Sequence, residues 1–137
     1  MSDSAPKPRP QYRNISIPQI LSYRLPLAGK SSIMHRVSGA LLFLCLPLVI
    51  VHLFALSVTS PESFAAMHAL VSHPACKIIL LILIWAFLHH FCAGIRYLTI
   101  DLHLGYDKVT AQKTAGAVFV VSLVLTVIFG LKLFGAW

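Results

Sequence analysis

The sequence predicts an all-α membrane protein with three transmembrane helices. Only 11% of its 137 residues are charged and 58% are hydrophobic, whereas about a quarter of the residues in a soluble domain are charged. Three nearly uncharged stretches are each long enough to cross a bilayer, which takes about 20 apolar residues on a helix. These spans lie at about residues 32–58, 76–100 and 114–134. We therefore expect an N-terminal cytoplasmic or interfacial segment, residues 1–31, followed by a three-helix membrane part, residues 32–137.

Capping residues and prolines divide the first half of the chain. The first span is expected to begin at Ser31 or Ser32, because serine is a good N-cap. Pro47 lies inside this span and should kink it, since proline lacks the N–H group that a helix interior needs. Beyond the span, Ser60 is expected to cap a short helix that Pro74 ends.

Positive charge is distributed unevenly along the chain, whose net charge is +7. Nine of the 11 Lys and Arg residues fall before the first span or around the second connector, and only Lys77 and Lys132 fall on the other side. Loops on the cytoplasmic side carry the excess of such residues. The N-terminus is therefore predicted to be cytoplasmic and the C-terminus to lie on the opposite side. The chain is too apolar for nucleic acid, so lipid headgroups are the expected partner of this charge.

The three cysteines, Cys45, Cys76 and Cys92, have no CxxC or CxxCH spacing. This spacing argues against covalently attached haem, a zinc site or an iron–sulfur cluster in this chain. The cysteines are interpreted as small hydrophobic residues.

Ionisable side chains at the end of the second span indicate a site, because such groups are costly in a membrane and usually carry function. On a helix, His90, Gly94 and Tyr97 share one face. Asp101 continues this face. A histidine near a glycine leaves room for a flat group such as haem, whose iron the imidazole could bind. The alternative is a buried histidine bonded to a carbonyl group, with Gly94 serving helix packing. His89 points about 100° away, so the face that includes Gly94 favours His90.

Depth decides which histidines could share a haem. At 1.5 Å per residue, His52 lies roughly 24 Å from the cytoplasmic edge and His90 roughly 15 Å from it. A mismatch of about 9 Å makes them a poor axial pair. His35 lies at the edge, where it could reach a haem propionate or a lipid headgroup. The second axial ligand is therefore expected from another chain.

A hydroxyl and a guanidinium group lie together at the start of the first span, where Ser32 and Arg36 are separated by four residues. Such a pair can hold a carbonyl oxygen, as a quinone headgroup presents, and stabilise negative charge on it. The alternative is a capping serine beside an arginine that reaches toward the headgroups. Asp101 could relay protons to this site, or could pair with Arg96 or Lys108.

Two motifs in the sequence resemble those of a known family, the cytochrome b membrane-anchor subunits of succinate dehydrogenase (respiratory complex II). Residues 32–39, SIMHRVSG, resemble the family signature S-I-x-H-R-x-[ST]-G. Residues 90–101, HFCAGIRYLTID, resemble its second signature, H-x-x-x-G-[IL]-R-H-x-x-x-D. Arg9-Pro10 and residues 23–26, YRLP, resemble its N-terminal pattern.

This resemblance implies roles for five residues. His90 matches the axial ligand of haem b, the other ligand coming from a second anchor subunit. His35 and Arg36 match residues near the haem propionates, and Ser32 and Arg36 match residues of the ubiquinone site. Asp101 matches an acidic residue at the quinone end.

The implied function is that of a membrane anchor in the bacterial inner membrane. The implied partners are the second anchor, an iron–sulfur subunit that passes electrons to ubiquinone, and a flavoprotein that oxidises succinate. The chain would not itself oxidise succinate. Tyr97 departs from the family, which often has histidine there, so it is left out of the axial assignment. The alternative function is a haem-free structural anchor of a related fumarate reductase-type complex.

Overall fold

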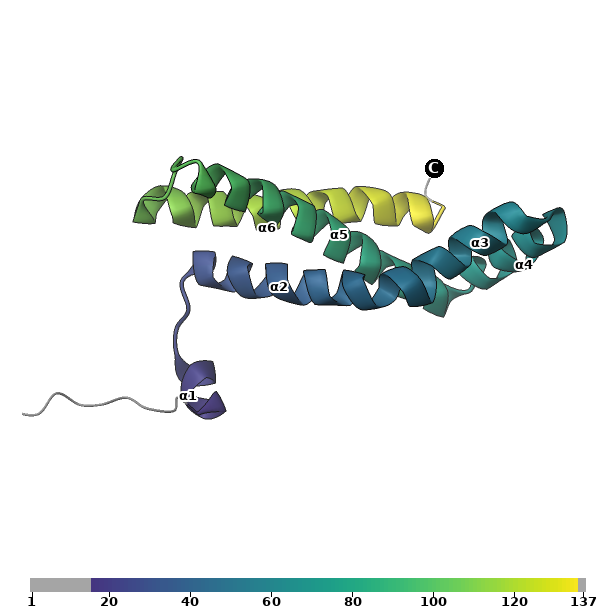
Figure 1. The fold of residues 1–137 in the computed structure, drawn as a ribbon, viewed down its shortest axis with the longest axis horizontal. Coiled ribbons are helices and arrows are strands. Elements are labelled where there is room, and N and C mark those ends of the chain that lie inside the picture. Colours follow the sequence, from purple (N-terminus) through teal and green to yellow (C-terminus); the bar gives the residue numbers. More distant parts are fainter. Residues whose placement is uncertain (1–15, 136–137) are drawn as a thin grey trace, which may run out of the picture.

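The computed structural model describes residues 16–135, which are mostly helical (Figure 1). Three helical stretches are long and apolar enough to cross a membrane: Leu27–Thr59, Pro74–Asp101 and Lys108–Leu133. The predicted all-α class with three membrane-spanning helices is confirmed. The expectations for residues 1–15, which include the Arg9-Pro10 pair, lie outside the described residues.

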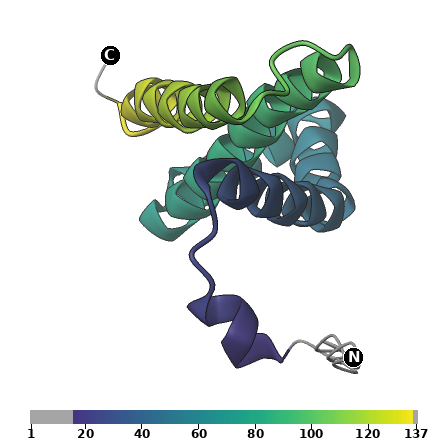
Figure 2. The ribbon, with the colours of Figure 1, turned by 90° about the vertical axis from the view of Figure 1, so that its left-hand side faces the viewer.

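The first long helix, α2 (Leu27–Cys45), begins earlier than the sequence suggested. Its N-cap is Pro26, in an extended conformation, so the predicted cap at Ser31 or Ser32 is wrong. Ser31 instead lies inside the helix, where it is fully buried. A helix can start directly after a proline, because the first N–H groups of a helix have no partner within it. A short helix, α1 (Ile17–Ser22), precedes α2 and stands away from the bundle (Figures 1 and 2).

Contacts with the last helix explain the early start of α2. The backbone N–H of Ala28 donates to Gln112 Oε1 at 3.2 Å, which satisfies one of the unpaired donors at the helix end. The side chain of Leu27 packs toward Gly116, whose position would place a Cβ atom 3.4 Å from Leu27 Cδ2. Both partners are 84 or more positions away in the sequence, so no local pattern could show them.

Pro47 widens the first long helix locally. Residues Leu46–Ile50 form a π-helical turn, η1, between α2 and α3 (Val51–Thr59). The N–H of Val51 bonds to the carbonyl of Leu46, five residues back. Because Pro47 has no N–H to donate, the wider turn restores backbone bonding after it. The disturbance predicted at Pro47 thus takes the form of a π turn.

A capping box starts the connector helix α4 (Pro61–Ser72), as the sequence predicted for Ser60. The Ser60 hydroxyl accepts from the Ser63 N–H at 3.1 Å, and the Ser63 hydroxyl accepts from the Ser60 N–H at 2.9 Å. After α4 the chain turns at His73, and α5 (Pro74–Asp101) begins with a proline in its first turn.

A tight turn joins α5 to α6 (Lys108–Leu133). His103 and Gly105 both have positive φ angles, 61° and 68°, which reverse the chain in a few residues. Asp107 then caps α6, its Oδ1 accepting from the N–H groups of Val109 and Thr110 at 3.1 and 2.9 Å. The turn places the end of α5 beside the start of α6. The start of α2 lies at the same end of the bundle (Figure 1).

The three long helices pack through small and polar side chains. Helix α5 contacts both α2 and α6, and α2 also contacts α6. Ala86, Ala93 and Ala115 are fully buried where the helices meet, because small residues allow the close backbone approach that membrane helices use. Large apolar side chains cover the outside of the bundle instead. In a bilayer these surfaces face lipid or another membrane subunit.

The Asp107 cap should make stability depend on pH. Hydrogen bonds from the Thr110 side chain and backbone, and from Val109, hold the pKa of Asp107 below its ordinary value. A lowered carboxyl pKa stabilises the fold above the unfolded value of about 3.9 and loses that contribution as pH falls through the folded pKa. Replacing Asp107 with Ala should therefore lower the melting temperature in detergent at neutral pH, and the difference from the wild-type protein should shrink below about pH 4.

Asp107→Asn is the matched control, because asparagine caps a helix nearly as well as aspartate without a charge. Its melting temperature should stay close to that of the wild-type protein at neutral pH. A difference between Asp107→Ala and the wild-type protein that is constant with pH would contradict the role of the carboxylate.

Candidate functional site

His90 lies on α5 and faces α2. Its Nδ1 atom is 3.0 Å from the carbonyl oxygen of His35. A carbonyl oxygen can only accept a hydrogen bond, so Nδ1 carries the proton and donates. The other ring nitrogen, Nε2, then keeps its lone pair. This is the arrangement in which a histidine binds a metal, with its second nitrogen bonded to a carbonyl that fixes the ring.

Gly39 on α2 makes the space for this imidazole. A Cβ atom at position 39 would lie 2.7 Å from His90 Cε1, closer than two such atoms approach. Gly94, which the sequence placed near His90, faces His35 instead, and a Cβ there would be 3.9 Å from His35 Nε2. The glycine beside the His90 ring is therefore Gly39 of the facing helix and not Gly94, as the helix face had predicted.

His35 stacks on His90. The two ring centroids are 4.2 Å apart and the planes differ by 15°. Tyr97 lies next to His35, with its ring centroid 5.1 Å from that of His35. Because the two rings are stacked, His35 and His90 lie beside each other. They therefore do not face one metal ion from opposite directions. Within residues 16–135 no group of three or more His, Cys, Asp or Glu side chains could hold a metal ion.

Ser32 and Arg36 come together at the same end of α2. Arg36 Nη2 lies 3.5 Å from Ser32 Oγ, at the upper limit for a hydrogen bond. Arg36 is exposed and Ser32 is half-buried, so both can reach a molecule outside the bundle. Asp101 is exposed at the last residue of α5, at this same end (Figure 1).

Two buried residues on the other face of α5 were not predicted as part of the site. His89 is fully buried between the rings of Trp85 and Phe119, with its Nδ1 3.5 Å from the Ser122 hydroxyl. Arg96 is only 7% exposed and bonds to α6. The spacing from His89 to Arg96, seven residues, places them on one helix face. This periodicity was the available signal for both.

The hydrogen bonds of Arg96 bear on its expected pairing with Asp101. Its Nε donates to Thr114 Oγ1 and its Nη2 to the carbonyl oxygen of Ala111, both at 3.1 Å. These acceptors lie on α6, so the bonds recorded for Arg96 are not made with Asp101.

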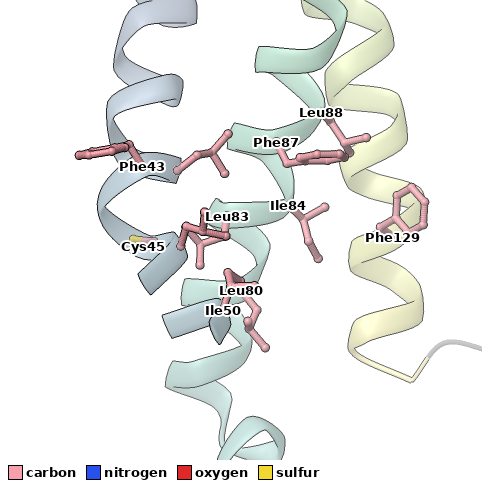
Figure 3. A pocket seen from close by; sticks show the side chains of 11 residues that line it. Phe43, Cys45, Ile50, Leu80, Leu83, Ile84, Phe87, Leu88 and Phe129 are labelled. Carbon is pink, nitrogen blue, oxygen red and sulfur yellow. The ribbon is translucent and has the colours of Figure 1, made fainter. Parts of the chain in front are cut away.

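An apolar groove lies along α5 before His89 and His90, and neither histidine lines it (Figure 3). It has a volume of about 650 Å³, and Figure 3 shows side chains of α2, η1, α5 and α6 around it, including Phe43, Phe87 and Phe129. Phe87 precedes His90 by three residues and Phe43 follows Gly39 by four, so the groove begins about one helical turn from their contact. Its lining consists of hydrocarbon side chains and Cys45.

Comparison with known proteins gives a consistent set of relatives. The family described as succinate dehydrogenase/fumarate reductase transmembrane subunit matches residues 7–129. The chain is 37% identical to the succinate dehydrogenase cytochrome b556 subunit of Coxiella burnetii, over 81% of this chain and 89% of that protein. It is 38% identical to the subunit of that name from Paracoccus denitrificans, over 81% and 85% of the two chains. A more distant relative of that name, from Rickettsia bellii, is 27% identical over 81% and 86%.

These matches confirm the family that the two motifs predicted. With the three membrane-spanning helices, they also confirm the predicted location in a bacterial membrane.

The Gly39 contact can be tested by stability. Gly39→Ala should lower the melting temperature in detergent, because the new methyl group would displace the His90 ring, and overpacking of this kind costs about 1–3 kcal/mol. Gly94→Ala is the matched control, since its methyl group would meet His35 Nε2 at an ordinary distance. Both changes bring the same gain in helix propensity. Equal melting temperatures for the two variants would argue against close contact between His90 and Gly39.

Proposed function

Because the chain belongs to the succinate dehydrogenase/fumarate reductase transmembrane-subunit family, we propose that it anchors a succinate dehydrogenase complex and takes part in quinone reduction. With a second anchor subunit it would bind one haem b and complete a ubiquinone site. The observation that carries this proposal is the half-buried position of the His90 imidazole, which a hydrogen bond from Nδ1 to the His35 carbonyl holds with Nε2 available to a ligand.

The residues around His90 fit a haem. The imidazole is held from two sides, by the carbonyl of His35 and by Gly39, and an apolar groove begins about one helical turn away. A haem bound there would supply a one-electron centre whose potential depends on its axial ligands and their hydrogen bonds. His90 would hold the haem iron from this chain. The relatives carry cytochrome b556 in their names, which supports the assignment.

The second axial ligand is assigned to the partner anchor. His35 is stacked beside His90 rather than opposite it, and His52 lies on α3, on the far side of the π turn. His35 and Arg36 instead serve the propionates, since both lie at the bundle end where the charged groups gather. The Tyr97 hydroxyl can add a donor there, because its oxygen is buried and has no hydrogen-bond partner within residues 16–135.

Ser32 and Arg36 are proposed to hold the ubiquinone headgroup. The Ser32 hydroxyl and the Arg36 guanidinium can both donate to one carbonyl oxygen of the quinone. The fixed positive charge would then stabilise the negative charge that develops on this oxygen during reduction. Asp101, exposed at the same end, is proposed to deliver protons to the reduced quinone.

The orientation and the partners follow from this assignment. The end that carries Arg36, Arg96 and Lys108 would face the cytoplasm, where the positive-inside rule places it. The iron–sulfur subunit would deliver electrons at this end, and the flavoprotein would oxidise succinate. The exposed apolar surface of the bundle would be covered by the second anchor and by lipid.

The ligand role of His90 is tested by spectroscopy. Replacing His90 with Ala in the purified complex should abolish or strongly reduce the sharp b-type band in the reduced-minus-oxidised visible spectrum. His52→Ala is the matched control, because it removes another histidine from a predicted span, and its spectrum should match the wild type. An unchanged band in His90→Ala would refute the ligand role. No band in the wild-type complex would favour the haem-free anchor.

The quinone site is tested by separating two activities. In the complex, Arg36→Leu should reduce the rate of succinate:ubiquinone reduction about 100-fold to 1,000-fold, the range for removing a stabilising donor. Succinate oxidation with a water-soluble artificial acceptor should persist, because that reaction bypasses the membrane subunit. Lys30→Leu, which removes an exposed positive charge from the first turn of α2, should leave both rates near normal. Normal ubiquinone reduction by Arg36→Leu would contradict the assignment.

A further inference from the structure

Arg96 is a buried cation bonded to neutral groups. It is 7% exposed, and within residues 16–135 the oxygens recorded as accepting from it belong to the Thr114 hydroxyl and the Ala111 carbonyl. A charged side chain among membrane helices is costly and usually has a function. Its two bonds come from different nitrogens of the rigid guanidinium fork, so they fix both the position and the tilt of the group.

The guanidinium group also contacts the aromatic side chains of the site. Its central carbon, Cζ, lies 5.3 Å from the centroid of the Tyr97 ring, within the range of a cation–π interaction. The Tyr97 ring is 5.1 Å from that of His35, and His35 stacks on His90 at 4.2 Å. A continuous series of contacts therefore runs from the first turns of α6, through Arg96, to the imidazole of His90.

We infer that Arg96 is a positioning residue for the haem-ligand histidine. It holds the end of α5 against α6 and fixes the Tyr97 ring, which in turn limits the positions open to His35 and His90. This inference rests on the proposed function, because it takes His90 as the axial ligand. It assigns to Arg96 the orientation of the ligand ring and not a contact with quinone or haem.

Neither lysine nor glutamine can replace arginine in this role. Lysine would keep the charge but offers a single ammonium group, which cannot make the two bonds in the same geometry. Glutamine would keep hydrogen-bonding capacity but lose the charge and part of the reach. The contact with Tyr97 depends on a cation over the ring face. Both substitutions should therefore loosen the Tyr97 ring.

The experiment measures the geometry of the ligand directly. In the purified complex, the electron paramagnetic resonance g values of an oxidised low-spin haem report the orientation of its axial imidazoles. Arg96→Lys and Arg96→Gln should both shift and broaden the largest g value while haem remains bound. Lys113→Gln is the matched control, because it removes an exposed positive charge from the first turns of α6, and its signal should match the wild type.

Three further variants test the contact series even if the Arg96 variants do not assemble. Tyr97→Leu removes the ring and the hydroxyl, whereas Tyr97→Phe removes only the hydroxyl, so Tyr97→Leu should shift the g value more than Tyr97→Phe. Thr114→Val removes one acceptor at nearly constant volume and should give a smaller shift than Tyr97→Leu. A Tyr97→Leu signal identical to that of Tyr97→Phe would overturn the inference.

The remaining outcomes are distinguishable. A shift confined to Arg96→Gln, with Arg96→Lys like the wild type, would show that only the charge matters and would overturn positioning. Wild-type g values in both Arg96 variants would also overturn it, while leaving the proposed function intact. A wild-type complex without a b-type haem signal would instead mean that the proposed function fails.

Discussion

The hydrogen bond between His90 Nδ1 and the carbonyl oxygen of His35 determines the arrangement of the site. It joins α5 to α2 within the membrane part, and it requires Gly39 because any side chain there would occupy the space of the imidazole. A donor that is buried among apolar helices without a partner would cost free energy, so this bond also holds the two helices in register. The ring stack and the start of the apolar groove both follow from this register.

Helix α5 has two faces with different roles. The adjacent residues His89 and His90 lie on different faces. His90 points to α2, whereas His89, about 100° around the helix, is fully buried against α6. The α6 side also holds Ala93 and Arg96, so it combines close packing with polar bonds. Packing closes the face toward α6, so movement of α5 relative to α6 is restricted. The face that carries His90 can therefore remain open to a ligand.

Local patterns in the sequence predicted what depends on a single segment. The three spans followed from apolar length, and the Ser60 cap followed from a serine before a proline, since neither depends on a distant residue. The start of α2 was misplaced because Gln112 on α6 satisfies one of its first donors, the N–H of Ala28. Gly39 and Arg96 were missed as site residues for the same reason. Their partners lie on other helices, and periodicity within one helix shows only which residues share a face.

The two interpretations of His90 from the sequence, packing residue and metal ligand, require the same hydrogen bond. A packing histidine must satisfy its buried Nδ1–H, and a ligand histidine must hold that N–H so that Nε2 stays oriented. The bond to His35 therefore does not separate them, and the exposure of the ring is the feature on which they differ. His89 is fully buried between aromatic side chains, and its Nε2 has no hydrogen-bond partner within residues 16–135. His90 is only half-buried and stacks on His35. The half-buried ring of His90 leaves room for a ligand to approach, which the enclosed ring of His89 does not.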